Sequence, residues 1–268
     1  MSFATIEARA AAIHCHLFLL CPNNSGSTYL SGAIGRSSHV WSLEREGQHV
    51  VGFGGPSTMA TPWPLIWGGT PESLAHFAEA DYDWERTRKA WYFHAKAARE
   101  DAPVFHTKSP PFLLVADQLR SKFEGARFLL MVRDPYATIE GIIRRRSRSQ
   151  SVENPADLVR VAARHLVTCF EYQRRNITLL GESAVFFTYE DLCAEPCKIA
   201  GRITDLVPDL DDLDLVQTIP VKGSYEEPLR NMNDQQIARL DPQDRAIANE
   251  VFEPNRSVLE AFGYTLLD

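Results

Sequence analysis

Several polar residues directly follow short apolar runs, and their types suit the binding of an anion. The first group is Pro22-Asn23-Asn24-Ser25-Gly26-Ser27-Thr28, after the apolar run 17–21. The first backbone N–H groups of a helix have no internal partner, and the helix dipole places partial positive charge there. We therefore predict a phosphate loop in which Gly26 allows close approach of the backbone. Its hydroxyl donors are Ser25, Ser27 and Thr28. The alternative is a simple helix cap.

Two further groups follow predicted strands. Lys108-Ser109-Pro110 comes after the strand predicted at 103–107, and Arg133-Asp134-Pro135 comes after the strand at 127–132. Ligands of an open α/β sheet bind at the carboxyl ends of its strands, so we expect these groups to converge on one crevice. The guanidinium of Arg133, directly after a buried strand, is well placed to bind a phosphate through two parallel (bidentate) hydrogen bonds. Asp134 is expected to cap the next helix.

The elements that position these residues alternate between strand and helix. Strands are predicted at 16–21, 40–43, 103–107, 127–132 and 184–188. Helices are predicted at 27–36, 84–99, 110–122, 135–146, 155–180, 189–207 and 234–262. This order indicates an α/β fold with a mostly parallel sheet covered by helices on both faces, in three layers. The 268 residues are expected to form a single domain, 1–268.

The segment 50–83 begins with a long stretch rich in glycine, proline and tryptophan. Gly and Pro break both helical and strand periodicity, so a surface loop is predicted from Val50 to Pro71. We expect 50–83 to be an insertion on the acceptor side of the site. Trp63 and Trp67 either line an acceptor pocket or pack the loop onto the body of the protein.

Charge and composition exclude several classes of protein. A net charge of −7 argues against a general nucleic-acid binder. The longest apolar runs have five residues, far too few for a membrane span. The five cysteines are scattered, which favours buried thiols over disulfides or a metal site. We expect a cytoplasmic enzyme without a metal ion. Three glycine signatures are absent from the sequence: the Walker-type Gly-x-x-x-x-Gly-Lys-Ser/Thr of phosphate-loop kinases, the Gly-x-Gly-x-x-Gly of dinucleotide oxidoreductases and the Gly-x-Ser-x-Gly of α/β-hydrolases.

Several motifs together resemble the PAPS-dependent sulfotransferase family, in its bacterial, Golgi-type branch. The motifs stand in family order over nearly the whole chain. They are Asn24-Ser25-Gly26-Ser27-Thr28, Lys108-Ser109-Pro110, Phe128 to Pro135, Tyr189-Glu190-Asp191-Leu192 with Pro196, and Phe262-Gly263-Tyr264. The resemblance implies a P-loop-like fold and transfer of a sulfuryl group from 3'-phosphoadenosine 5'-phosphosulfate (PAPS). The acceptor would be a hydroxyl or amine of a small molecule or glycan, and the product adenosine 3',5'-bisphosphate (PAP).

The resemblance also implies residue roles. The loop 24–28 would hold the 5'-phosphosulfate, Arg133 would grip the 3'-phosphate, and Lys108 would balance charge at the bridging oxygen. Two positions depart from the family pattern: Asn24 stands where a basic residue is expected, and Gly141 where a serine is expected. Gly141 removes one donor to the 3'-phosphate. Lys222 and Arg230, in a loop punctuated by Gly and Pro, are further candidates for the nucleotide.

A base must take the proton of the acceptor, and the resemblance points to Glu46. The alternative is that Glu46 is a solvated loop carboxylate without a catalytic role. Glu44 and His49 are the next candidates for the base. His106 is expected to be a buried strand histidine rather than the base. The basic run Arg144, Arg145, Arg146 and Arg148 suits a helix C-terminus, although it could also attract an anion.

Two other functions remain open at this point. One is a metal-dependent nucleotide phosphotransferase, which would need Mg²⁺ and a carboxylate ligand. The other is a non-catalytic nucleotide-binding protein, which the departures at Asn24 and Gly141 keep in view.

Overall fold

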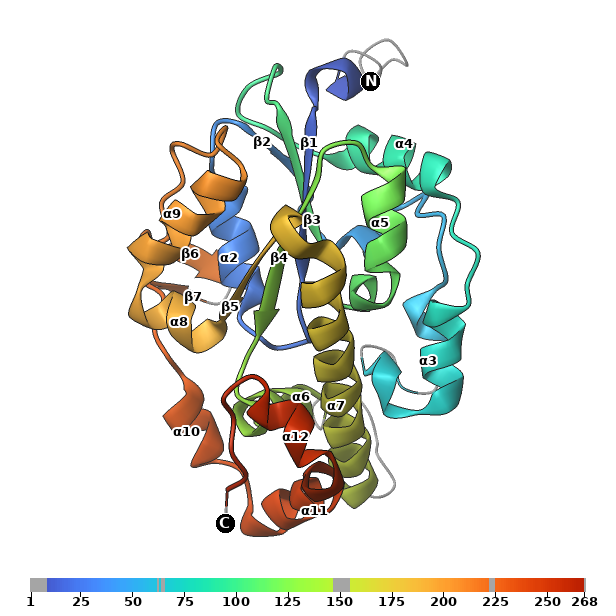
Figure 1. Ribbon diagram of the computed structural model, residues 1–268, viewed down its shortest axis with the longest axis vertical. Helices are drawn as coiled ribbons and strands as arrows, with labels where there is room; N and C mark the ends of the chain where they lie inside the picture. The colour runs from blue at the N-terminus through green and yellow to red at the C-terminus, as the bar shows by residue number, and fades with distance from the viewer. Residues whose placement is uncertain (1–8, 62, 64–65, 147–154, 222–224, 268) are drawn as a thin grey trace.

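The computed structural model describes residues 9–61, 63, 66–146, 155–221 and 225–267. Five parallel strands form its central sheet, in the order β2-β3-β1-β4-β5 (Figure 1). The strands are β1 (Cys15–Leu20), β2 (Val40–Ser42), β3 (Val104–Lys108), β4 (Ala126–Val132) and β5 (Ala184–Thr188). The predicted α/β fold with a parallel sheet is confirmed.

Helices cover both faces of the sheet, because successive side chains of a strand point to opposite sides. In β1, Phe18 and Leu20 belong to the core cluster on one face, whereas Leu17 and Leu19 belong to the cluster on the other. The first face is covered by α4 (Trp84–His94), α5 (Ala116–Lys122) and α7 (Pro155–Leu180), and the second by α2 (Ser27–Ile34), α8 (Tyr189–Ala194) and α9 (Pro196–Leu206) (Figure 1).

A third core cluster lies beyond the carboxyl end of the sheet, where α7 meets the C-terminal helices. The C-terminal helices are α10 (Asn233–Ile237), α11 (Pro242–Phe252) and α12 (Arg256–Glu260), and they gather with α6 (Pro135–Arg146) in the lower part of Figure 1. A buried amide ties α7 to the sheet, since Gln173 Nε2 donates to the carbonyl groups of Leu20 (2.9 Å) and Met131 (3.2 Å). The helix α7 has the bounds that the sequence predicts.

The segment 50–83 differs from the expected loop. It contains the helix α3 (Pro71–Ala78), which begins at a Thr70 cap, and two short 3₁₀ turns. Trp67 is fully buried, and its ring lies edge-on to His165 of α7 with 4.8 Å between centroids. Trp67 therefore packs the segment onto the body of the protein and does not line an acceptor pocket.

A small antiparallel hairpin was not predicted from the sequence. It consists of β6 (Ile219–Val221) and β7 (Tyr225–Glu227) and packs beside α2. The runs Ile219-Pro220-Val221 and Tyr225-Glu226-Glu227 contain a proline and two adjacent acidic residues, which are disfavoured in strands. Among the described helices, none combines the length and apolar character needed to cross a bilayer.

Candidate active site

The loop between β1 and α2 has the backbone expected of an anion-binding loop. Asn24 (φ 60°) and Gly26 (φ 85°) both adopt the left-handed conformation, which turns the chain sharply into α2. Gly26 is the N-cap residue of α2, and no side chain caps the first N–H groups there. These donors are therefore available for a ligand, as an anion at a helix N-terminus requires.

Ser25 differs from the other hydroxyl residues of this loop. Its side chain is fully buried, and its hydroxyl donates to the carbonyl oxygen of Pro22 at 2.7 Å. The expectation that the Ser25 hydroxyl donates to a phosphate is therefore not met in this structure. Ser25 instead braces the turn that presents Gly26.

The ammonium group of Lys108 connects the loop with the end of β3. Its Nζ lies 3.3 Å from Ser27 Oγ and 3.3 Å from Thr28 Oγ1, and 3.4 Å from Glu46 Oε1. Only about 13% of the Lys108 side chain is exposed. The Lys108 and Glu46 side chains thus meet at the first turn of α2, although they come from different strand ends.

Glu46 is oriented by a second neighbour. Gln48 Nε2 donates to Glu46 Oε2 at 3.1 Å, and His49 Nε2 lies 3.8 Å from the same oxygen. The backbone N–H of Gln48 in turn donates to Ser109 Oγ, next to Lys108. Glu44 lies elsewhere, in an exposed ion pair with Lys96. Glu46 and His49 are therefore the candidate bases that the structure brings to the loop.

His106 is buried below the same loop. One ring nitrogen lies 2.9 Å from Ser31 Oγ and the other 3.0 Å from the carbonyl oxygen of Leu17. Burial lowers the pKa of His106 to about 4, so the ring is neutral at pH 7. His106 is the buried strand histidine that the sequence favours.

Arg133 follows β4 and reaches the phosphate loop from the other side. It is only 6% exposed, and its Nη1 donates to the carbonyl oxygen of Asn24 at 3.1 Å. Its Nε donates to Asn233 Oδ1 at 2.9 Å, and its Nη2 donates to Gln236 Oε1. The loops around residues 25, 108 and 133 therefore converge, as expected from the strand ends.

The ring of Tyr189 lies between the loop and the guanidinium. The Arg133 Cζ atom lies 4.2 Å from the ring centroid, a cation–π distance. A Cβ atom on Gly26 would come within 2.6 Å of the same ring. The Tyr189 hydroxyl donates to the carbonyl oxygen of Arg230 at 2.7 Å. Tyr189 thus connects the phosphate loop with Arg133 and with the backbone near Arg230.

Glu190 joins three segments behind Arg133. Its carboxylate accepts from the Asp134 N–H (2.9 Å), from the Asn233 amide and from the Tyr264 hydroxyl (2.8 Å). Burial raises the pKa of Tyr264, which keeps its hydroxyl a donor. The contact between Glu190 and Tyr264 joins the motif that begins at Tyr189 with the motif Phe262-Gly263-Tyr264. Asp134 caps α6 as predicted, since its Oδ1 accepts from the Ala137 N–H.

The space beside Gly141 is filled by neighbouring side chains. A Cβ atom at this position would lie 3.3 Å from Asn24 Cβ and 3.3 Å from Gln236 Nε2. That amide nitrogen donates to Glu140 Oε2 at 2.8 Å, and Glu140 pairs with Arg144 at 2.7 Å. Gly141 thus leaves room for the Gln236 side chain.

The remaining candidates contribute less. Arg230 is exposed, and its backbone carbonyl is the part of the residue seen to contact the site. Arg144 is engaged by Glu140, as a structural role of the basic run predicts. Lys222, Arg148 and the side chain of Arg146 lie outside what the structure describes.

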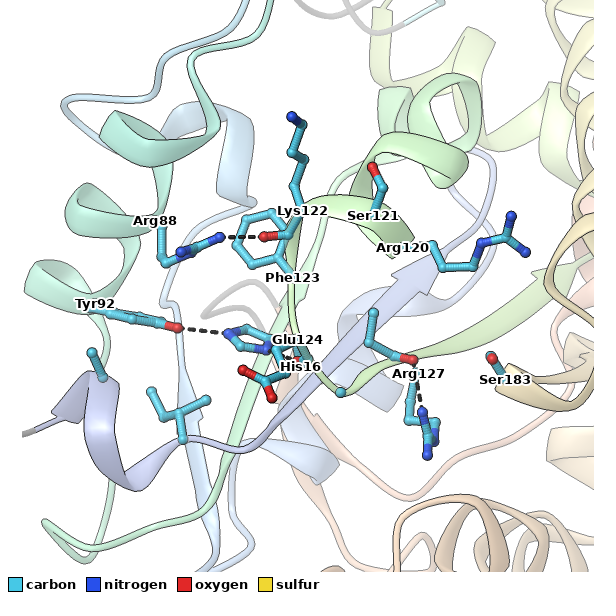
Figure 2. A pocket seen from close by; sticks show the side chains of 14 residues that line it. His16, Arg88, Tyr92, Arg120, Ser121, Lys122, Phe123, Glu124, Arg127 and Ser183 are labelled. Atoms are coloured by element: carbon cyan, nitrogen blue, oxygen red, sulfur yellow. Dashed lines mark hydrogen bonds between the residues drawn. The ribbon is translucent and has the colours of Figure 1, made fainter.

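A hollow of about 600 Å³ lies at the starts of β1 and β4, at the other end of the sheet from the phosphate loop. Figure 2 shows the side chains that line it. Arg88, Arg120 and Arg127 line it, but each donates to a backbone carbonyl group. Their guanidinium groups lie apart and do not point toward a common centre (Figure 2). This hollow is therefore not an assembled anion site.

Within the described residues, one group has the spacing of metal ligands: His39, Asp211 and Asp212. It lies beside the start of β2, at the far end of the sheet from the phosphate loop. Asp212 already accepts hydrogen bonds from Ser37 and Ser38. The group therefore has a structural explanation.

Two site residues were missed in the sequence. Asn233 and Gln236 stand three apart on one face of α10 and both contact Arg133. Their spacing is the only signal in the sequence, and it is weak, because exposed helices commonly carry amides. Tyr189 and Glu190 belong to one of the motifs on which the family resemblance rests, and no contact with Arg133 was predicted for them. The capping box of Thr188 and Asp191 is found there, and the contacts with Arg133 are additional.

Comparison with known proteins agrees with this geometry. A model of the sulfotransferase family matches residues 17–208. The sulfotransferase STF9 of Mycobacterium avium is 14% identical, with a TM-score of 0.58, over 97% of this chain and 80% of that one. A sulfotransferase of Alicyclobacillus acidocaldarius is also 14% identical, with a TM-score of 0.53, over 94% and 97% of the two chains. These likenesses show a shared fold. No curated protein sequence matches the chain.

Proposed function

The chain belongs to the sulfotransferase family, and on this premise we propose that it transfers a sulfuryl group from PAPS to a hydroxyl or amine acceptor. The observation that carries the proposal is the position of Lys108. Its ammonium lies 3.3 Å from the hydroxyl oxygens of Ser27 and Thr28, at a helix start that no side chain caps. Cation, hydroxyls and free N–H groups there form a site for one highly charged phosphate group.

The residues of the loop fit the donor in spite of the neutral Asn24. A basic residue at position 24 would have placed a positive charge in the loop. Lys108, which lies beside the loop, supplies that charge instead. PAPS, when bound, supplies an activated sulfuryl group attached to a phosphate. Ser27, Thr28 and the first N–H groups of α2 would hold that phosphate, and Lys108 would stabilise the charge that develops on it.

Glu46 would accept the proton of the acceptor. Its carboxylate lies 3.4 Å from Lys108 Nζ and is held on its other side by Gln48. Proton transfer to a positioned carboxylate requires hydrogen-bond reach of the acceptor group. Gln48 Oε1 is buried and finds no hydrogen-bond partner among the described residues, so the contact of Gln48 with Glu46 is made through Nε2.

Arg133 would bind the 3'-phosphate of the nucleotide. All three of its identified hydrogen-bond acceptors are uncharged oxygens, so its positive charge is not neutralised by an ion pair. Arg230 and Lys222 would extend this side of the site.

The single domain 1–268 and the acceptor-side position of 50–83 are part of the same proposal. Val51 and Met59, exposed at 79% and 76%, follow Glu46 and would contact a small-molecule or glycan acceptor.

We place the protein in the cytoplasm. This proposal is supported by its five free cysteines, three of which are buried. Fractionation of cells that express the tagged chain, with probes for a secreted and a cytoplasmic marker, tests it. Recovery with the secreted marker would refute a cytoplasmic location.

The binding of PAP and of adenosine monophosphate (AMP) to the purified protein tests the main proposal. We expect PAP to bind more tightly, because AMP lacks the 3'-phosphate. In Arg133→Ala this preference should fall by about ten- to a hundredfold, the range for a lost charge-assisted contact. Equal affinity of the parent protein for PAP and AMP would refute the assignment of Arg133.

Turnover in the presence of a chelator separates the remaining alternatives. Sulfuryl transfer by the residues above should persist in excess EDTA, whereas a nucleotide phosphotransferase needs Mg²⁺. A protein that binds PAP tightly but transfers no sulfuryl group to a broad panel of alcohols, phenols and amines would be a non-catalytic binder.

A further inference from the structure

We infer that Asn233 and Gln236 are positioning residues that orient the Arg133 guanidinium and separate it from two neighbouring carboxylates. The inference rests on the proposed function, because it takes Arg133 as the group that binds a 3'-phosphate. It goes beyond that function by assigning a role to α10, which lies 100 residues further along the chain (Figure 1).

The oxygen ends of the two amides face the guanidinium. Asn233 Oδ1 accepts from Arg133 Nε at 2.9 Å, and Gln236 Oε1 accepts from Nη2. The Asn24 carbonyl accepts from Nη1 and the Tyr189 ring covers one face, so four neighbours fix the orientation of the guanidinium. Three of its five N–H donors are used, so two remain for a ligand.

The nitrogen ends of the same amides face carboxylates. Asn233 Nδ2 donates to Glu190 Oε1, and Gln236 Nε2 donates to Glu140 Oε2 at 2.8 Å. Glu140 is only 5% exposed, so its charge is weakly screened by water. Each amide therefore stands between a carboxylate and Arg133, with its dipole aligned to satisfy both.

This separation matters for anion binding. An arginine in a direct, buried pair with a carboxylate has much of its positive charge offset and its N–H donors occupied. Both carboxylates are also held away from it by other partners, Glu140 by Arg144 and Glu190 by Tyr264. The positive charge of Arg133 therefore remains available to attract an anionic ligand.

A glycine at position 141 suits this arrangement. A Cβ atom there would lie 3.3 Å from Gln236 Nε2, so the amide would have to shift by a few tenths of an ångström. The glycine therefore does more than remove a donor: it makes room for Gln236 to reach Arg133.

Substitution of the amide and of the carboxylate behind it tests the inference. We measure PAP and AMP affinity by calorimetry for Gln236→Ala, for Gln236→Ala/Glu140→Gln, and for Asn233→Asp. Gln236→Ala should weaken PAP by tenfold or more and leave AMP within about twofold. Adding Glu140→Gln should restore most of the loss, because the side chain that Gln236 separates from Arg133 is then uncharged. Asn233→Asp should weaken PAP selectively.

The control is Gln235→Ala, on the exposed face of the same helix, which should leave both affinities unchanged. PAP affinity in Gln236→Ala equal to that of the parent would overturn the inference while the proposed function stands. Failure of Glu140→Gln to restore binding would overturn the separation of charges. A parent protein without preference for PAP would overturn the proposed function and the inference with it. Should Gln236→Ala not fold, as judged by circular dichroism, selective loss in Asn233→Asp decides.

Discussion

Substitution of Gly26 by alanine should lower the free energy of unfolding for two reasons, both of which concern the phosphate loop. The first is backbone strain, because φ is 85° and an L side chain in the left-handed region costs about 1–2 kcal/mol. The second is a clash, because the new Cβ atom would lie 2.6 Å from two ring carbons of Tyr189. The ring is buried and packs against Arg133, so it is not free to move away.

Gly263 provides a matched control for the strain. Its φ is 82°, and an added Cβ atom would meet nothing within 4 Å. Gly263→Ala should therefore lower the free energy of unfolding by about 1–2 kcal/mol from strain alone. Overpacking in a tight site adds about 1–3 kcal/mol, so Gly26→Ala should cost about 2–5 kcal/mol in all.

The assay is urea unfolding of the parent and both variants, followed by tryptophan fluorescence, together with calorimetric titration of PAP. Gly26→Ala should unfold at a lower urea concentration than Gly263→Ala and should also bind PAP less tightly, since the ring it displaces supports Arg133. Equal unfolding free energies for the two variants would refute the contact between Gly26 and Tyr189.

Three further predictions concern catalysis and pH. Glu46→Gln should slow sulfuryl transfer at saturating PAPS by about 10²–10⁴-fold with PAP affinity nearly unchanged, and an unchanged rate would exclude Glu46 as the base. Lys108→Met should slow the same rate by about 10²–10³-fold, measured as PAP release. Burial lowers the pKa of both His16 and His106 to about 4, so their neutral forms stabilise the fold above pH 6.5, and this stability is lost as the pH falls toward 4. Unfolding free energies should drop by about 2 kcal/mol per histidine between pH 7.5 and 5, and His106→Asn should flatten this dependence.

The elements of the fold were predictable where the sequence pattern is strong. The range 155–180 has an apolar stripe over 26 residues, and the structure has α7 with those bounds. The run 184–188 likewise became β5. The segment 50–83 was harder, because its glycines and prolines conceal both α3 and the burial of Trp67. That burial depends on packing against α7, about 100 residues away, and local composition does not encode it.

The same distinction between local sequence patterns and long-range packing applies to the candidate site. Loops at strand ends are local features, so the sequence located the groups around Gly26, Lys108 and Arg133 and predicted their convergence. The direction of a hydroxyl is not local in this sense: Ser25 turns inward to Pro22, while its neighbour Ser27 faces Lys108. No sequence pattern distinguishes these two serines.

The departures from the family pattern have a physical explanation only in three dimensions. Asn24 carries no charge, but its carbonyl accepts from Arg133 and its side chain adjoins Gly141. Gly141 in turn leaves the space that Gln236 fills on its way to Arg133. Asn24 contacts the Arg133 guanidinium directly, whereas Gly141 faces the Gln236 amide that contacts the same guanidinium. Because the two positions also adjoin each other, their changes are coupled. A basic residue at position 24 or a serine at 141, introduced alone, would act on an arginine already held by α10, so neither departure by itself indicates lost activity.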